Sequence, residues 1–176
     1  FFTQKTAYEI RLSLVGSEMC IRDRFRGVSY VTMDAKGRMS VPVRYREQLS
    51  QLCSGEVVVT IDTEENCLML YPLPAWNDVE RKIEALPTFN KAARRIQRLL
   101  IGHATDIQMD GSGRLLLPAP LREYALMEKK LVLLGQINKI EIWSESHWLS
   151  RREQLIAVKD ESSEEDQPDF LETLSL

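Results

Sequence analysis

Histidine, cysteine and glycine-rich segments are scarce in this chain of 176 residues, and each shortage excludes a class of function. The two histidines, His103 and His147, lie in different halves, so the sequence contains no cluster of metal ligands and no histidine-based acid–base pair. It also contains no glycine-rich phosphate cradle and no nucleophile motif. No stretch approaches the roughly 20 apolar residues that span a bilayer. We therefore expect no enzyme, no metal site, no cofactor and no membrane association.

The first 24 residues resemble translated sequencing-library adapter rather than a natural protein segment. Charged residues interrupt this stretch, and no part of it resembles the apolar region of a signal peptide. We therefore expect the native chain to begin at Phe25 or one residue before it. Once Cys20 is set aside with this stretch, Cys53 and Cys67 remain. Two thiols without a secretory signal indicate a reducing, cytoplasmic location.

The charges of the chain are segregated. Residues 25–159 hold 19 Lys and Arg against 16 Asp and Glu, whereas residues 160–176 hold seven acidic residues and no base. A mildly basic body with an acidic tail indicates either a protein that binds nucleic acid or a basic surface whose binding is regulated. We expect the tail to be disordered, and we hypothesise that it shields the basic surface from random DNA.

One motif occurs twice, first over Val31–Pro42 and again over Ile107–Pro118. Met, Asp, Gly, Arg and Pro coincide in the two copies without a gap, and a weaker match continues through Arg46 and Arg122. Self-similarity of this kind indicates duplicated structural units. Each half, at about 45 residues, is too small to be dependably stable alone. The two halves should therefore share one core.

Both copies predict the same order of elements. In the first half, apolar patterning and turn residues predict a strand over 25–33, a turn over 34–37, a strand over 38–41, a helix opening at Pro42, and strands over 56–61 and 67–71. In the second half they predict a strand over 107–109, a turn over 110–113, a strand over 114–117, a helix opening at Pro118, and strands over 131–134 and 139–143 joined by 135–138.

Two helices are predicted between the halves, and one more follows over about 145–158. The first shows an apolar stripe formed by Trp76, Val79, Ile83 and Leu86. The second, from about Asn90, is expected to bury Ile96, Leu99 and Leu100 and to display Lys91, Arg94, Arg95 and Arg98. The basic residues allow three interpretations, namely a solvated helix face, a DNA-backbone contact or a subunit interface, with the solvated face as the default. Most aromatic residues, including Tyr30, Tyr45 and Tyr71, are expected in the core.

Each predicted turn places an arginine directly after a glycine. Such an arginine can project from a rigid hairpin, and its planar fork matches the O6 and N7 atoms of guanine. We expect Arg38 to be the principal reader, with Lys36 and Arg26 as supporting contacts and Arg114 as a weaker homologous candidate. The alternative interpretation is that Asp34 and Arg38 pair across the hairpin only to fix the turn. From the residues alone, both interpretations remain open.

The paired Asp-x-x-Gly-Arg turns, Phe25-Arg-Gly at the expected start, and the basic helix ending Arg98-Leu-Leu-Ile-Gly-His103 resemble the MraZ family. This is a family of bacterial transcription regulators related to AbrB and SpoVT, and the likeness covers essentially all of 25–176. It implies an α+β fold, a double-split β-barrel made of two tandem AbrB-like swapped-hairpin repeats with flanking helices. We expect the repeats at 28–74 and 104–147, connecting helices at 75–103, a C-terminal helix at 148–159 and the acidic tail at 160–176.

The resemblance also implies a function. Family members form ring-shaped homo-oligomers that bind double-stranded DNA at short G-containing direct repeats. They act mainly as repressors at the promoter of their own division and cell-wall gene cluster, which implies a nucleoid association. This favours DNA contact by Arg38. The second turn has Ser112 where the first has Lys36, so it is expected to bind DNA more weakly or to serve subunit contacts. The competing hypothesis is a ring-forming structural or interaction protein without direct DNA readout.

Overall fold

A computed structural model describes residues 24–87 and 89–157 of the chain. The expected start of the native chain at Phe25 therefore falls within the described part, whereas almost all of the adapter-like segment and the whole acidic tail lie outside the described residues. The chain divides into two compact units, a body that ends at Glu145 and a C-terminal unit that begins at Ser146. The described part of the second unit belongs to helix α6 (Glu145–Ala157).

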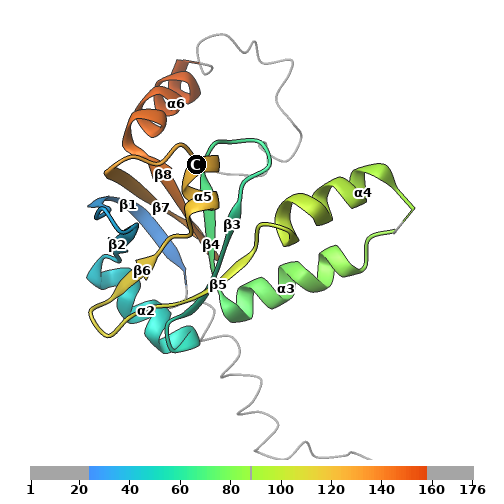
Figure 1. The fold of residues 1–176 in the computed structure, drawn as a ribbon, viewed down its shortest axis with the longest axis horizontal. Helices are drawn as coiled ribbons and strands as arrows, with labels where there is room; N and C mark the ends of the chain where they lie inside the picture. Colours follow the sequence, from blue (N-terminus) through green and yellow to red (C-terminus); the bar gives the residue numbers. More distant parts are fainter. Residues whose placement is uncertain (1–23, 88, 158–176) are drawn as a thin grey trace, which may run out of the picture. The chain divides into compact units, whose positions relative to one another are not determined.

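The two halves of the body contain the same elements in the same order (Figure 1). The first half consists of β1 (Phe25–Thr32), β2 (Arg38–Ser40), α2 (Val43–Cys53), β3 (Glu56–Ile61) and β4 (Leu68–Pro72). The second half consists of β5 (Thr105–Gln108), β6 (Arg114–Leu116), α5 (Ala119–Tyr124), β7 (Lys130–Ile137) and β8 (Lys139–Ser144). The duplication predicted from the sequence is therefore a duplication of structure.

Pro42 and Pro118 are expected at the first helical position of α2 and α5. In the structure each proline is instead the N-cap residue, one position before the helix begins. Pro42 has φ −55° and ψ 143°, and Pro118 has φ −58° and ψ 143°. This extended ψ continues the preceding strand, while the carbonyl of Pro42 already accepts a hydrogen bond from the N–H of Tyr45 at 2.9 Å. Each proline thus lies between a strand and a helix and starts the helix without leaving an N–H of its own unpaired.

Every hairpin strand pairs with the other half of the chain. The main antiparallel sheet has the order β1-β7-β8-β4-β3-β5, and a separate ribbon joins β2 to β6. Val28 of β1 lies opposite Leu134 of β7, and Met39 of β2 lies opposite Leu115 of β6. β1 and β2 themselves share only an isolated bridge close to their turn. The fold is therefore the expected α+β split barrel with swapped hairpins.

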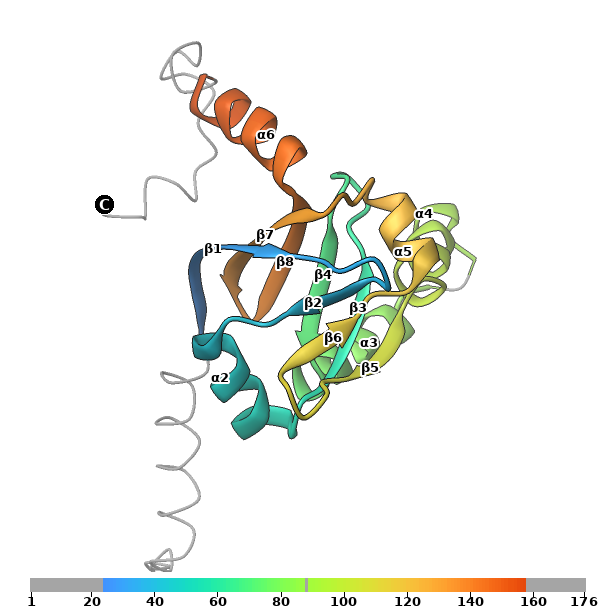
Figure 2. The same cartoon turned by 60° about the vertical axis from the view of Figure 1, so that its left-hand side comes forward.

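The main core lies between the sheet and the layer formed by the β2–β6 ribbon, α2 and α5 (Figure 2). Both halves contribute fully buried side chains to it, including Met39, Tyr45 and Leu49 from the first half and Leu115 and Leu117 from the second. Burial of one such side chain contributes about 1.5–3 kcal/mol. Separation of the halves would expose all of them, which explains why the repeats fold as one unit.

A second cluster packs on β3 and β4 around Val58, Met69, Tyr71 and Trp76. It involves the helical hairpin of α3 (Leu73–Glu84) and α4 (Lys91–Ile96), which continues into the π-helix η1 (Gln97–Ile101). The buried hydroxyl of Thr60 donates a hydrogen bond of 2.6 Å to the carbonyl of Leu100 and so fixes η1 against β3. The predicted stripe is confirmed for Trp76 and Ile83, which are buried.

Two expectations about individual residues and one about a segment are wrong. Ile96 is 39% exposed. Ala93 occupies the buried position of α4, and the helix changes to the wider π-helical turn directly after Ile96. Tyr30 is 56% exposed, because it lies on a face of β1 that the described chain leaves uncovered. The expected connection at 135–138 is mostly strand, since β7 continues to Ile137 and pairs Gln136 with Lys139 around a tight turn.

Candidate nucleic-acid interface

The turn that joins β1 to β2 is closed by one carboxylate. Asp34 Oδ1 accepts hydrogen bonds from the backbone N–H groups of Lys36 (2.9 Å) and Arg38 (3.0 Å). Asp34 Oδ2 accepts a bond of 2.8 Å from Arg38 Nε and lies 2.7 Å from Arg38 Nη2. Gly37 completes the turn with φ +85°, a conformation that disfavours any residue with a Cβ. The interpretation that Asp34 holds the loop is confirmed.

These bonds favour the ionised form of the carboxyl. The backbone N–H of Arg38 is the largest cause that lowers the pKa of Asp34 below its ordinary value, and desolvation opposes it. The side chain of Arg38 and the N–H of Lys36 lower this pKa further. The carboxylate is therefore charged at neutral pH and neutralises part of the positive charge of the turn.

The second turn repeats this arrangement atom by atom. Asp110 Oδ1 accepts from the N–H groups of Ser112 and Arg114, both at 2.9 Å, and Asp110 Oδ2 accepts from Arg114 Nε at 2.8 Å. The N–H of Arg114 is likewise the largest cause that lowers the pKa of Asp110. The tips differ in two side chains. Ala35 corresponds to Gly111, and the ammonium group of Lys36 corresponds to the hydroxyl group of Ser112.

The ion pair with Asp34 uses only some of the hydrogen-bond donors of the Arg38 guanidinium. Asp34 engages the inner edge of the group, Nε and Nη2, and the side chain remains 35% exposed. Nη1 and the second hydrogen of Nη2 take no part in this ion pair, and together they can donate to the two acceptors of a guanine. The two interpretations that the sequence left open are thus compatible, because the ion pair that fixes the turn also orients the arginine.

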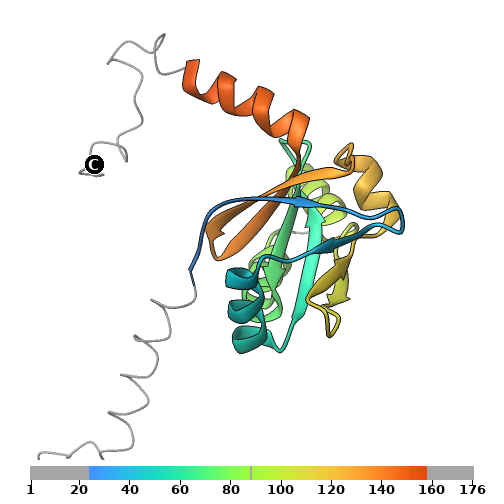
Figure 3. The same ribbon diagram turned by 90° about the vertical axis from the view of Figure 1, so that its left-hand side faces the viewer.

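The predicted site residues do not form one cluster within a single chain. Arg38 lies opposite Leu116 and Arg114 lies opposite Ser40, so the two tips are at opposite ends of the β2–β6 ribbon (Figures 2 and 3). Arg26 lies near the start of β1, roughly 25 Å of strand away from the turn. Only Lys36 and Arg38 share a tip.

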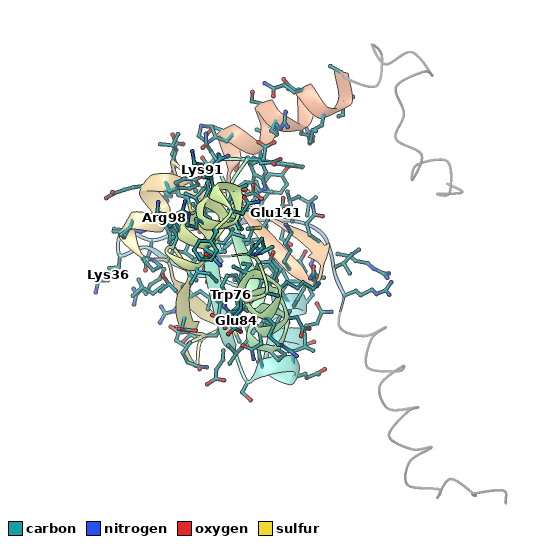
Figure 4. The ribbon with its side chains drawn as sticks, turned by 90° about the vertical axis from the view of Figure 1, so that its right-hand side faces the viewer. Lys36, Trp76, Glu84, Lys91, Arg98 and Glu141 are labelled. Carbon is teal, nitrogen blue, oxygen red and sulfur yellow. The ribbon has the colours of Figure 1, made fainter. Side chains whose placement is uncertain are left out.

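Lys36 stands out from the edge of the molecule, with Arg98 of the helical hairpin the nearest labelled residue in this view (Figure 4). The exposed basic residues of α4 and η1 line one concavity of about 450 Å³. Its lining consists of Lys91, Arg94, Arg95, Arg98 and Leu99. The default interpretation of these residues as a solvated helix face agrees with their exposure.

Sequence reasoning missed two residues that contact the turns from the opposite repeat. The guanidinium of Arg122 on α5 lies against Gly37, and that of Arg46 on α2 lies against Gly113. The available signal was the weak continuation of the repeat, which aligns Arg46 with Arg122. It identified equivalent positions, but it could not indicate that each one crosses to the other repeat.

Within residues 24–87 and 89–157, no group of three or more His, Cys, Asp and Glu side chains could hold a metal ion. None of the helices described there is long and apolar enough to cross a membrane.

The sequence matches a known family in two successive copies. The family, described as "MraZ protein, putative antitoxin-like", matches residues 25–99 and 100–171. A protein of Alkalilimnicola ehrlichii, named "Transcriptional regulator MraZ", is 54% identical over 152 residues, which cover 86% of this chain and 99% of the relative.

Two further relatives carry the same name. The protein of Halorhodospira halophila is 56% identical over 128 residues, or 73% of this chain and 84% of the relative. The protein of Legionella pneumophila (strain Corby) is 50% identical over 152 residues, or 86% of this chain and 99% of the relative. With both repeats matched and half or more of the aligned residues identical to those of these relatives, the chain belongs to the MraZ family.

Proposed function

We propose that this protein is a transcriptional regulator, not an enzyme, and that it binds double-stranded DNA through the turn at 34–38. Arg38 reads guanine in the major groove, and Lys36 binds a neighbouring phosphate. The observation that carries the proposal is the geometry of Arg38, whose Nε and Nη2 are held by Asp34 while its side chain is still 35% exposed. A preorganised side chain loses less conformational entropy on binding than a free one.

The remaining candidates have lesser roles in this proposal. Arg114 has the same geometry as Arg38 but lacks a neighbouring ammonium group, so it contributes less affinity or serves subunit contacts. Arg26 contacts a separate stretch of phosphate backbone, because the length of β1 separates it from the turn. The division into repeats at 28–74 and 104–147, with connecting helices at 75–103 and a C-terminal helix at 148–159, belongs to the same proposal.

We further propose that the protein acts as a ring-like homo-oligomer. Val28 and Tyr30 are 47% and 56% exposed on β1, and an apolar surface of this kind suits contact with another copy. In a ring, several copies of the turn engage successive short G-containing direct repeats, and binding gains from high effective concentration. The proposed target is the protein's own promoter and the division and cell-wall gene cluster. The proposed role is mainly repression, in the cytoplasm and associated with the nucleoid.

Paired measurements on an Arg38→Ala variant test this function. The variant should bind DNA from immediately upstream of its own coding sequence at least tenfold more weakly in a gel-shift titration. A lost bidentate guanine contact costs about 1–3 kcal/mol, and a ring multiplies this cost. Light scattering and the melting temperature of the same samples should remain unchanged. Normal DNA binding by the variant would remove Arg38 from the role of reader.

Arg81→Ala provides a matched control. Arg81 also pairs with a nearby aspartate, Asp78, but it lies on α3 and far from the turn in sequence and fold. This variant should bind the upstream DNA as the unmodified protein does. A similar loss of affinity in both variants would indicate a general effect of positive charge rather than base readout.

The competing function is that of a structural or interaction protein that forms a ring and does not read DNA directly. The exposed apolar residues of β1 are the observation that favours this function. In that case the Asp-x-x-Gly-Arg turns lie in subunit interfaces, and Arg38→Ala changes the size of the oligomer first. Light scattering beside the gel shift separates the two functions.

A further inference from the structure

The turn at 34–38 is backed by a guanidinium from the opposite repeat. A Cβ placed on Gly37 would lie 2.9 Å from both Cζ and Nε of Arg122, so the guanidinium is in close contact with the glycine backbone. Arg122 is itself partly buried on α5. Arg122 therefore lies directly behind Gly37, the residue before Arg38, where it can restrict movement of the turn.

Hydrogen bonds anchor this guanidinium and the turn to the same strand end. Arg122 Nε donates to the carbonyl of Leu117 at 3.0 Å. The N–H of Leu117 donates in turn to the carbonyl of Gly37 at 2.9 Å. The backbone of the first turn is therefore docked on the second repeat at two points, a hydrogen bond and a stacked guanidinium.

A similar arrangement occurs at the other tip with the repeats exchanged, although Nη2 rather than Nε is the donor there and the buried Nε of Arg46 has no hydrogen-bond partner among the described residues. Arg46 on α2 packs against Gly113, and its Nη2 donates to the carbonyl of Val41 at 3.1 Å. The N–H of Val41 donates to the carbonyl of Gly113 at 2.9 Å. Because both tips use equivalent residues, the contact is a property of the duplicated fold rather than of one loop.

We propose that Arg122 is a positioning residue for DNA recognition by Arg38, and that Arg46 has the same role for Arg114. Each repeat sets the orientation of the arginine that the other repeat presents. The proposal rests on the function assigned above to the turn. The physical reason is that Gly37, with φ +85°, is the flexible point before Arg38, and the backbone direction at this point determines where the guanidinium projects.

This role differs from direct contact with DNA. Arg122 donates its Nε hydrogen to a backbone carbonyl, and its plane is covered on one side by the turn. A positioning residue affects DNA affinity only through the order of the turn. Its replacement should therefore change the dynamics of residues 34–38 in the absence of DNA, a result that loss of a phosphate contact would not produce.

Hydrogen–deuterium exchange on the full-length protein tests the proposal without DNA. Arg122→Met keeps an apolar stem but removes the Nε donor and the guanidinium. Exchange in a peptide spanning 33–39 should accelerate about tenfold, while a peptide spanning 109–115 should be unchanged. Arg46→Met is the matched control and should show the reverse pattern. Arg122→Lys, which keeps the charge, should resemble Arg122→Met, and it serves as the informative variant if the methionine variant does not fold.

Gel shifts with the upstream DNA complete the test. Arg122→Met and Arg122→Lys should bind it about 5- to 30-fold more weakly while their oligomer size remains unchanged. Weaker binding with unchanged exchange would assign Arg122 to direct DNA contact and overturn the proposal. Unchanged DNA binding together with unchanged exchange would make Arg122 a packing residue. Equal acceleration of exchange at both turns would indicate general loosening of the fold. Either result would also overturn the proposal. Failure of Arg38→Ala to weaken binding would refute the proposed function but leave the exchange result intact.

Discussion

Gly27 of the first repeat and Gly135 of the second lie directly opposite each other in the β1–β7 ladder. A Cβ on Gly135 would overlap the backbone nitrogen of Arg26 and the carbonyl carbon of Phe25. The overlap involves backbone atoms, which cannot move aside as a flexible side chain can. The close approach of these strands therefore requires glycine at position 135, and it is one of the contacts that joins the two repeats.

Replacement of this glycine should destabilise the whole body. Gly135→Ala is expected to reduce the free energy of unfolding by about 1–3 kcal/mol, because the two strands must separate to accept the methyl group. Urea denaturation followed by circular dichroism measures the change. Gly111→Ala is the control, since a Cβ there has no atom within 4 Å. An equal loss in both variants would contradict the argument from close strand approach.

Acid should loosen both turns. Asp34 and Asp110 have pKa values lowered in the folded protein, chiefly by the backbone N–H groups of Arg38 and Arg114. Their contribution to turn stability is therefore complete above the ordinary aspartate pKa of about 3.9, and it is lost as the pH falls through the lowered value. Hydrogen exchange at 33–39, corrected for its intrinsic pH dependence, should stay constant from pH 7 to about pH 5 and rise below about pH 4.

Asp34→Asn separates this effect from general acid unfolding. The first turn of this variant should already exchange faster at pH 7, because an amide oxygen binds the guanidinium of Arg38 less strongly than a carboxylate does. The second turn should keep its normal protection. An unchanged first turn would indicate that the ion pair with Arg38 adds nothing to the order of this loop.

Lys36 and Arg38 should differ in their response to salt. Binding through phosphates releases counterions, so affinity falls steeply as the salt concentration rises. Lys36→Ala should weaken binding to all DNA sequences and reduce the slope of log affinity against log salt by about 0.9 per engaged subunit. Arg38→Ala should mainly reduce the preference for the upstream DNA over random DNA. Identical salt slopes for unmodified protein and Lys36→Ala would remove Lys36 from the phosphate contact.

The acidic tail supplies a prediction that depends only on the sequence, because residues 160–176 lie outside the described part of the chain. A protein truncated after Lys159 loses seven acidic residues and no base. Its affinity for random DNA should rise, and the increase should shrink at high salt as charges are screened. Fluorescence titration with a labelled random duplex measures the change. Unchanged affinity would identify the tail as a solubilising appendage.

Local patterns predicted the turns well because their chemistry is contained within a few residues. Asp34, Gly37 and Arg38 are close in sequence, and their hydrogen bonds follow from the geometry of a type I turn with a bulge. The same patterns were wrong about Tyr30 and Ile96, whose apolar character predicted burial. Apolar side chains also occur on exposed surfaces, so composition alone cannot determine which face of an element is covered.

The amino-acid sequence by itself determined the duplication, the two Asp-x-x-Gly-Arg turns and the identity of the arginines they present, since these depend on short-range spacing and turn chemistry. The swapped pairing of the hairpins was expected only from the family resemblance. The tertiary structure alone decided the register of this pairing, the position of the two tips at opposite ends of one ribbon, and the contact of Arg122 with Gly37. Strand pairing between distant segments depends on the burial of a core shared by both halves, and no local pattern within either half specifies its partner.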